Sequence, residues 1–264
     1  MRPVEFDLRF PVGGEEIRRN VEHALSLGLP DLLAQPARGE RLSILANGPT
    51  ALDANLGGPI LSLNGSLQLF RNTCRAPTWW AACDPQEMVA DFLLDAPMET
   101  TYLVASKCHP RVFEALKGRN VLLWHINEEA GDYFPLVAHR NPVMVAPTIT
   151  LCAFGIGELL GFSRFQTWGW DACYMGGLNH AAPQEHNTNG NCDLEVGPRT
   201  FRTTAAWMHE AGQASDIIEA WPRDLIVHGD GMIGAILRFH GLLPDADQGG
   251  MIPAAHTQPL EHIR

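Results

Sequence analysis

The chain of 264 residues is long enough for one α/β domain with extensions and short for two full domains. Hydrophobic residues make up 45% of it and charged residues 19%, which excludes a largely disordered chain and indicates a globular protein with a substantial core. The formal net charge of -11 argues against a nucleic-acid polymer as a partner, because such a partner requires clustered Lys and Arg. An acidic protein can still bind a single nucleotide, since backbone N–H groups and one Mg²⁺ ion can hold its phosphates.

Cysteine usage and hydropathy indicate the compartment. The six cysteines are scattered, with no CxxC pair and no secretory signal ahead of them, which favours a reduced environment. The apolar stretch over residues 143–162 is interrupted by Pro147, Gly155, Gly157 and Glu158 and is therefore unsuited to crossing a membrane. We expect a cytoplasmic protein that does not enter the membrane.

In chain order, the first expected element is an N-terminal helical extension over residues 1–40, where Ile17, Val21, Ala24 and Leu25 recur at helical spacing before Gly28. From residue 41, short apolar runs alternate with turns and amphipathic stretches, which is typical of strand–helix units on a mostly parallel sheet. The predicted strands are residues 42–46, 60–63, 79–83, 101–105, 121–125, 164–168 and 225–228, with a hairpin formed by 192–196 and 199–203. The predicted helices cover residues 85–94, 110–116, 150–160, the region around 207–218, and the residues after 231 to about 240. The predicted fold is a Rossmann-like α/β domain over residues 41–240, flanked by helices and followed by a C-terminal tail over 241–264.

Polar residues follow three successive predicted strands. The candidate nucleotide-binding residues at these strand ends are Asn47, Gly48, Pro49, Thr50, Asn64, Gly65 and Asp84. A strand that runs through a glycine turn into a helix can present backbone N–H groups to a phosphate at the carboxyl edge of the sheet. These ends converge if sequential strands are neighbours. The alternative interpretation is an ordinary strand-to-helix turn, with Asp84 capping the helix that follows.

Two later turns also combine a carboxylate with glycine. Gly169, a further candidate for nucleotide binding, precedes Asp171, and Asp230 lies between two glycines. Asp84, Asp171 and Asp230 are the candidate Mg²⁺ ligands, because carboxylates hold the ion that neutralises a polyphosphate; a solvated turn aspartate is the alternative.

The polar stretch over residues 172–191 is expected to form a loop that contacts the substrate. It contains His180, a candidate general base because imidazole titrates near neutral pH. Asp171 and His180 are the two candidate catalytic residues.

The order and spacing of these segments resemble the archaeal-type 6-hydroxymethylpterin diphosphokinase-like (MptE-like) family, which is common in bacterial and phage genomes. The resemblance runs from about residue 41 to residue 239. It is carried by Asn47-Gly48-Pro49-Thr50, Leu63-Asn64-Gly65-Ser66, Asp84-Pro85, residues 106–110, Gly169 to Tyr174, His180-Ala181 and Gly229-Asp230-Gly231. Family members usually carry Ser where this chain has Thr50, which keeps the hydroxyl. The resemblance implies a Rossmann-like domain that transfers diphosphate from ATP to the hydroxymethyl group of a reduced pterin, with Mg²⁺.

The same Asn-Gly-Pro-Thr turn and the downstream Asn also look like those of bacterial CMP-sialic-acid sialyltransferases. That resemblance implies a CMP-sugar donor bound by Asn47 and Asn64, with His180 as a candidate base. A CMP-sugar carries a single phosphate, so this interpretation does not require a metal ion. A third interpretation is a phage or accessory protein that keeps the fold without turnover. The expected partners are thus a nucleotide and a small-molecule acceptor, and self-association stays open.

Overall fold

The computed structural model describes residues 12–71, 73–144, 146, 148–182, 184, 192–220 and 224–244. Its centre is a seven-stranded sheet in the order β11-β8-β1-β2-β3-β4-β5, in which every pair of neighbouring strands is parallel. The strands are β1 (Leu42–Leu45), β2 (Ile60–Leu63), β3 (Trp79–Ala82), β4 (Thr101–Ala105), β5 (Asn120–Trp124), β8 (Arg164–Trp168) and β11 (Asp224–Val227). The predicted α/β Rossmann-like fold is confirmed.

The central strands read as continuous apolar runs because both faces of the sheet are covered. All residues of β1, β2 and β3 are buried. The polar side chains of Ser43 and Ser62 within these strands are hydrogen-bonded, to the Gly57 carbonyl and to Ser66 Oγ respectively. A strand buried on both sides loses the alternation of polar and apolar residues that marks a half-exposed strand.

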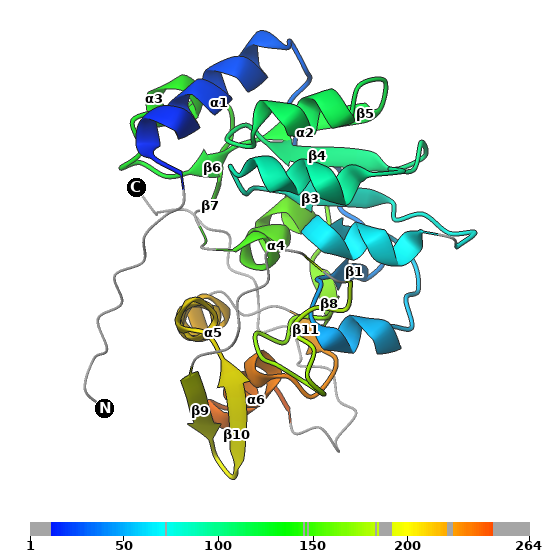
Figure 1. Cartoon of the computed structure of the whole chain (residues 1–264), viewed down its shortest axis with the longest axis vertical. Helices are drawn as coiled ribbons and strands as arrows, with labels where there is room; N and C mark the ends of the chain where they lie inside the picture. The colour runs from blue at the N-terminus through cyan, green and yellow to red at the C-terminus, as the bar shows by residue number, and fades with distance from the viewer. Residues whose placement is uncertain are drawn as a thin grey trace.

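Short helices follow each of the first four strands: η1 (Pro49–Asp53), η2 (Asn64–Phe70), η3 (Glu87–Leu93) and α2 (Pro110–Ala115). They form a row along the sheet in Figure 1, as expected when right-handed crossovers advance in one direction. The three η elements are 3₁₀ helices, so the helix predicted over residues 85–94 is shorter and more tightly wound than expected.

The chain then reverses direction across the sheet, since β8 lies beside β1 on the side away from β2. Helix α4 (Ile149–Leu159) precedes β8 and packs against β1, β2 and β3. Gly157 permits the close approach of this helix: a Cβ there would lie 2.6 Å from the Phe165 ring and 2.9 Å from Leu42. This reversal places a crevice between β1 and β8, the position where open α/β sheets bind ligands.

Peripheral elements complete the fold. Of the helical extension predicted over residues 1–40, helix α1 (Gly14–Ser26) is present and contacts α2, whereas residues 27–40 form no helix and residues 1–11 lie outside the described residues. The hairpin of β9 (Cys192–Val196) and β10 (Arg199–Thr203) has the predicted bounds, and α5 (Ala205–Ala220) and α6 (Met232–Phe239) flank it (Figure 1). Three short elements were not predicted, namely β6 (Ile126–Asn127), α3 (Phe134–Val137) and β7 (Val143–Met144). The predicted C-terminal tail lies outside the described residues from 245 onward.

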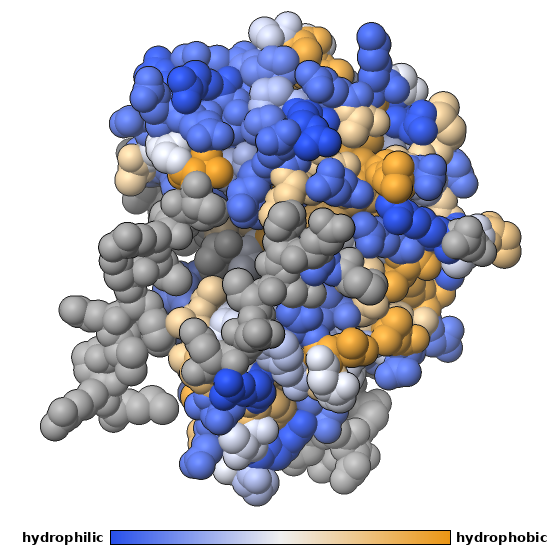
Figure 2. Space-filling view, viewed as in Figure 1, coloured by the Kyte–Doolittle hydropathy of each residue, from blue (hydrophilic) through white to orange (hydrophobic). Residues whose placement is uncertain are grey.

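Surface hydropathy is uneven. Figure 2 shows apolar side chains gathered over η1 and η2, whereas the surface around α1 and α2 is mainly hydrophilic. Leu52 on η1 is 58% exposed, and Leu69 on η2 is partly buried. Within the described ranges, no helix combines the length and the apolar character needed to span a bilayer.

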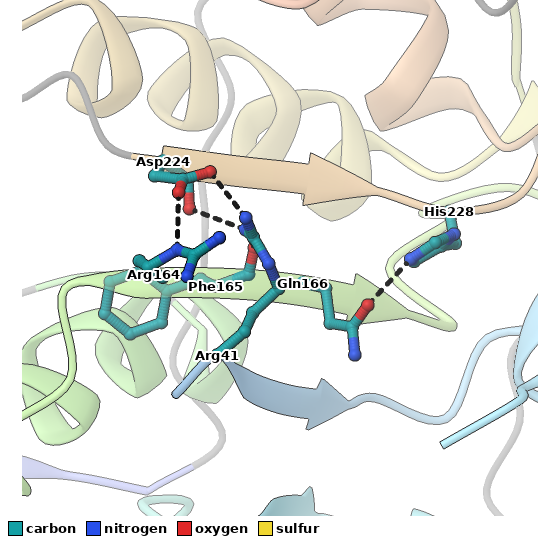
Figure 3. Close-up of polar contacts among 6 residues, drawn as sticks. All are labelled: Arg41, Arg164, Phe165, Gln166, Asp224 and His228. Carbon is teal, nitrogen blue, oxygen red and sulfur yellow. Dashed lines mark hydrogen bonds and ion pairs between the residues drawn. The ribbon is translucent and has the colours of Figure 1, made fainter. Parts of the chain in front are cut away.

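An ionic cluster joins the starts of three strands (Figure 3). The Asp224 carboxylate accepts hydrogen bonds from Arg41 Nη2 at 2.8 Å and from Arg164 Nε at 2.9 Å, and Arg41 Nη1 donates to the carbonyls of Phe165 and Asp224. Burial alone would raise the pKa of Asp224, but the hydrogen bonds and charges of Arg41 and Arg164 outweigh it and hold the pKa below its ordinary value. The cluster ties the edge strand β11 to β8 and to the residue preceding β1.

We expect Asp224→Asn to lower the free energy of unfolding by about 1–3 kcal/mol at pH 7, because two guanidinium groups lose their charged acceptor. A folded-state pKa below the unfolded one contributes stability above the unfolded pKa that is lost as pH falls through the folded pKa. The difference between wild type and Asp224→Asn should therefore shrink from about pH 4 downward in urea titrations. Exposed Asp216→Asn on α5 is the control. A gap that stays constant down to about pH 2 would contradict the assignment.

Candidate nucleotide-binding cavity

A cavity of about 390 Å³ opens at the carboxyl edge of the sheet. It is lined by residues that follow β1, β2, β3 and β8, by the first turn of α4, by α5, and by the loop after β8. Asn47, Asn64 and Asp84, the polar residues after three successive strands, all line it, so the predicted convergence of these strand ends is confirmed. The volume lies in the range of small-molecule sites, which is about 300–1,000 Å³.

The turn after β1 is fastened to the turn after β8. The backbone N–H of Thr50 donates to Asp171 Oδ2 at 2.8 Å, and Thr50 Oγ1 donates to Asp171 Oδ1 at 2.7 Å. Gly169 N–H donates to Thr50 Oγ1 at 3.1 Å, and Gly48 N–H donates to the Gly169 carbonyl at 2.8 Å. Asp171 is 1% exposed, and burial raises its pKa although the two Thr50 bonds act in the opposite direction. Both carboxylate oxygens of Asp171 thus hold the turn after β1 against the turn after β8.

This network engages backbone donors of the Asn-Gly-Pro-Thr turn. The N–H groups of Gly48, Thr50 and Gly169 already have internal acceptors, and Pro49 has no N–H. The Gly48 and Thr50 N–H groups of the turn are therefore engaged within the protein, and nucleotide binding by the turn stays a prediction. Gly48 and Gly169 line the cavity, whereas Pro49 and Thr50 are not among its lining residues.

Asn47 fixes the loop that follows β8. Its Oδ1 accepts from Ala182 N–H at 3.1 Å, its Nδ2 donates to the Ala182 carbonyl at 3.3 Å, and its carbonyl accepts from Ala181 N–H at 2.8 Å. Residues 172–182 and 184 of the predicted substrate loop are described, and four of them line the cavity: Ala172, Asn179, His180 and Gln184. Asn47 thus positions the loop over the cavity.

The ends of β2 and β3 contribute polar atoms to the lining. Asn64 adopts a left-handed conformation with φ of 45°, and its Oδ1 is buried with no hydrogen-bond partner among the described residues. Gly65 packs closely against two of the lining side chains, since a Cβ there would be 2.5 Å from Gln184 Nε2 and 2.8 Å from Asn47 Nδ2. Asp84 accepts from Gln86 N–H at 2.9 Å and from Gln86 Nε2 at 3.2 Å, which forms a turn ahead of η3. The N-cap of η3 is Gln86, so Asp84 does not cap this helix as the alternative interpretation expected.

The three predicted Mg²⁺ ligands do not converge. Asp84 and Asp171 both line the cavity, but both oxygens of Asp171 accept hydrogen bonds from Thr50. Asp230 pairs with Arg199 on the surface, with its side chain 74% exposed. Across the described ranges, no group of three His, Cys, Asp or Glu side chains is arranged to hold a metal ion. The described residues therefore do not fit the predicted Mg²⁺ site.

The remaining wall comes from two helices. His180 lines the cavity and packs edge-on against Trp207 of α5, with ring centroids 5.9 Å apart. Thr148, Ile149 and Thr150 bring the first turn of α4 to the cavity, where Thr148 caps the helix by accepting from Leu151 N–H. The first N–H groups of a helix have no intrahelical partner and carry partial positive charge, which suits them to an anion.

Sequence analysis missed Glu210, a buried acid on α5 that lines the cavity. Burial raises its pKa, while hydrogen bonds from Trp170 and Thr148 act in the opposite direction. A signal was present, because Glu210 lies three residues after Trp207 and four before Ala214, on the apolar face that predicts this helix.

Comparisons with known proteins agree on the fold. The chain is similar to the solved MAf glycosyltransferase from Magnetospirillum magneticum AMB-1, with a TM-score of 0.59 and 11% sequence identity over 89% of this chain and 42% of the other. This chain thus spans less than half the length of that protein. No family model and no curated protein matches the sequence. The comparisons do not support the pterin diphosphokinase-like family specifically.

Proposed function

We propose that this chain is the donor-binding domain of a glycosyltransferase whose donor is a sugar activated by one nucleoside monophosphate, as in a CMP-sugar. The observation that carries the proposal is the lining of the cavity. It contains amide side chains, aromatic rings and a helix N-terminus, but none of its described lining residues is Lys or Arg. The similarity to a glycosyltransferase fold supports the same class of reaction.

The absence of cations from the described lining bears on the number of phosphates. A triphosphate needs guanidinium, ammonium or metal charges to offset its own. A single phosphate needs less, and helix N-termini bind such groups with backbone N–H donors. In this arrangement the phosphate would lie at Ile149 and Thr150 of α4, and Asn64 would contact the nucleoside. The donor sugar would then extend toward Trp207.

The competing proposal is ATP-dependent diphosphate transfer to a hydroxymethylpterin-like acceptor. It would rely on Asp84 as a metal ligand. Asp84 lines the cavity, and unlike Asp171 it accepts no hydrogen bond from Thr50. The two proposals differ in what the folded protein should bind and in whether Mg²⁺ should be required.

Thermal shifts against ATP, GTP, CMP, CDP, UDP and CMP-sialic acid, each with and without Mg²⁺, separate these proposals. We expect CMP and CMP-sialic acid to raise the Tm without metal, by several degrees at about 100-fold excess over Kd, because ligand binding there adds about 2.7 kcal/mol. Stabilisation by ATP or GTP only with Mg²⁺ would favour diphosphate transfer. No change in Tm with any of these ligands would favour a non-catalytic accessory protein.

Asn64→Gly tests the site within this assay. Glycine tolerates the positive φ of residue 64, so the variant removes the amide without straining the backbone. Asn141→Gly is the matched control, because Asn141 also has a positive φ of 55°, is exposed and lies away from the cavity. We expect the Tm shift with CMP to fall by at least half in Asn64→Gly and to persist in Asn141→Gly. Equal shifts in both would remove Asn64 from the site.

A further inference from the structure

Glu210 is held in a fixed position at the cavity. The residue is 6% exposed, and both hydrogen bonds to its carboxylate reach the same oxygen. Trp170 Nε1 donates to Oε1 at 2.9 Å, and Thr148 Oγ1 donates to Oε1 at 3.0 Å. The donors come from the turn after β8 and from the cap of α4, while Glu210 itself comes from α5. Three elements therefore orient one carboxylate.

The second oxygen is left for a ligand. Oε2 accepts no hydrogen bond from a described residue, and it is not among the buried polar atoms that lack a partner. Glu210 lines the cavity, and Oε2 is the oxygen that its two hydrogen bonds leave unused there. A carboxyl whose Oε1 accepts two hydrogen bonds gains or loses its proton at Oε2.

We propose that Glu210 is the general base of the transfer reaction and takes the proton of the acceptor hydroxyl on Oε2. This inference rests on the proposed glycosyltransferase function. In the step, the acceptor oxygen forms a bond to the anomeric carbon of the donor sugar, and the bond from that carbon to the phosphate oxygen breaks. The electron pair leaves with the nucleoside monophosphate, and the acceptor proton ends on Glu210.

The surroundings suit a base that works near neutral pH. The other titratable residues in the described lining are Asp84, Asp171 and His180, and no Lys or Arg stands among them to lower the pKa of Glu210. Burial raises that pKa, which brings it closer to neutrality than a solvated carboxyl. Trp170 and Thr148 stabilise the ionised form, so the group can still act as a base. His180, the base expected from sequence, is the competing assignment.

Glu210→Gln tests the proposal, since glutamine keeps an oxygen for Trp170 and Thr148 but cannot accept a proton. The probe is CMP-sialic acid, with CMP release to water as the rate and the Tm shift as the measure of binding. We expect CMP release to fall at least about 100-fold with the Kd changed less than about threefold, because general bases contribute about 10²–10⁴ in rate. Exposed Glu219→Gln on the same helix should match wild type.

The pH profile identifies the base. Wild-type kcat/KM should rise with pH as Glu210 ionises, and this limb should be absent in Glu210→Gln. Loss of the limb in His180→Gln, with the limb kept in Glu210→Gln, would assign the base to His180 and overturn the proposal. Release within about threefold of wild type in Glu210→Gln would also overturn it. A wild-type protein that neither binds nor hydrolyses CMP-sialic acid would instead refute the donor assignment, and the base role with it.

Discussion

Asp171→Ala should lower the free energy of unfolding by about 3 kcal/mol or more and abolish nucleotide binding. The substitution leaves two buried donors on Thr50, its N–H and its hydroxyl, without their acceptors, and each unsatisfied donor costs about 1–3 kcal/mol. For a domain of this size each kcal/mol shifts the Tm by about 2–4 °C. Binding should fail because the turns after β1 and β8, which form the wall of the cavity, lose their connection.

Asp171→Asn should destabilise the protein less than Asp171→Ala does. An amide can accept from Thr50 N–H with its oxygen and donate to Thr50 Oγ1 with its nitrogen, so both contacts are kept. The Thr50 hydroxyl proton loses its acceptor, and the cost should be about 1 kcal/mol. Exposed Asp53→Asn at the end of η1 is the matched control and should leave the Tm within a degree. Chemical denaturation with each variant checks the order. If Asp171→Ala proves no less stable than Asp53→Asn, the turn does not depend on the carboxylate.

The strands of the sheet could be predicted because they are short apolar runs bounded by turns. The predicted ranges 60–63, 101–105 and 164–168 coincide with β2, β4 and β8, and the others differ by a residue at one or both ends. Strand order is a different matter. Neighbouring positions for β1, β2 and β3 follow from their succession in the chain, but the pairing of β8 with β1 joins residues more than 120 positions apart. No local pattern specifies such a pairing.

In the candidate site, too, some features follow from local sequence and others depend on the long-range pairing of strands. Asn47, Asn64 and Asp84 could be predicted to converge because each directly follows a strand. The use of the turn's N–H groups by Gly169 and Asp171 could not, since it depends on β8 lying beside β1. The surroundings of the three predicted Mg²⁺ ligands differ for a related reason, since a carboxylate after a strand can face a cavity, a neighbouring turn or another surface residue. Asp84 lines the cavity, Asp171 is bonded to Thr50 in the neighbouring turn, and Asp230 pairs with Arg199 on the surface.

Gly48→Ala should be about as damaging as Asp171→Ala, for a purely steric reason. A Cβ at residue 48 would lie 2.5 Å from Asp171 Oδ2 and 2.5 Å from the Gly169 carbonyl oxygen. Gly48 has φ of -70°, which alanine adopts freely, so the backbone conformation adds no penalty. Overpacking at a site that can yield costs about 1–3 kcal/mol, and we expect the upper end because one neighbour is backbone and the other is held by Thr50.

Gly57→Ala is the matched control, because nothing lies within 4 Å of a Cβ built there. A double-mutant cycle then isolates the mechanism. If the methyl group added at residue 48 acts mainly by displacing the Asp171 carboxylate, Gly48→Ala combined with Asp171→Ala should be less destabilising than the sum of the two, by at least about 1 kcal/mol. The Gly169 carbonyl remains in the way in the double variant, so the relief should be partial. Additive effects would show that the added methyl group is accommodated without moving Asp171, and that the two turns are less tightly coupled than their hydrogen bonds indicate.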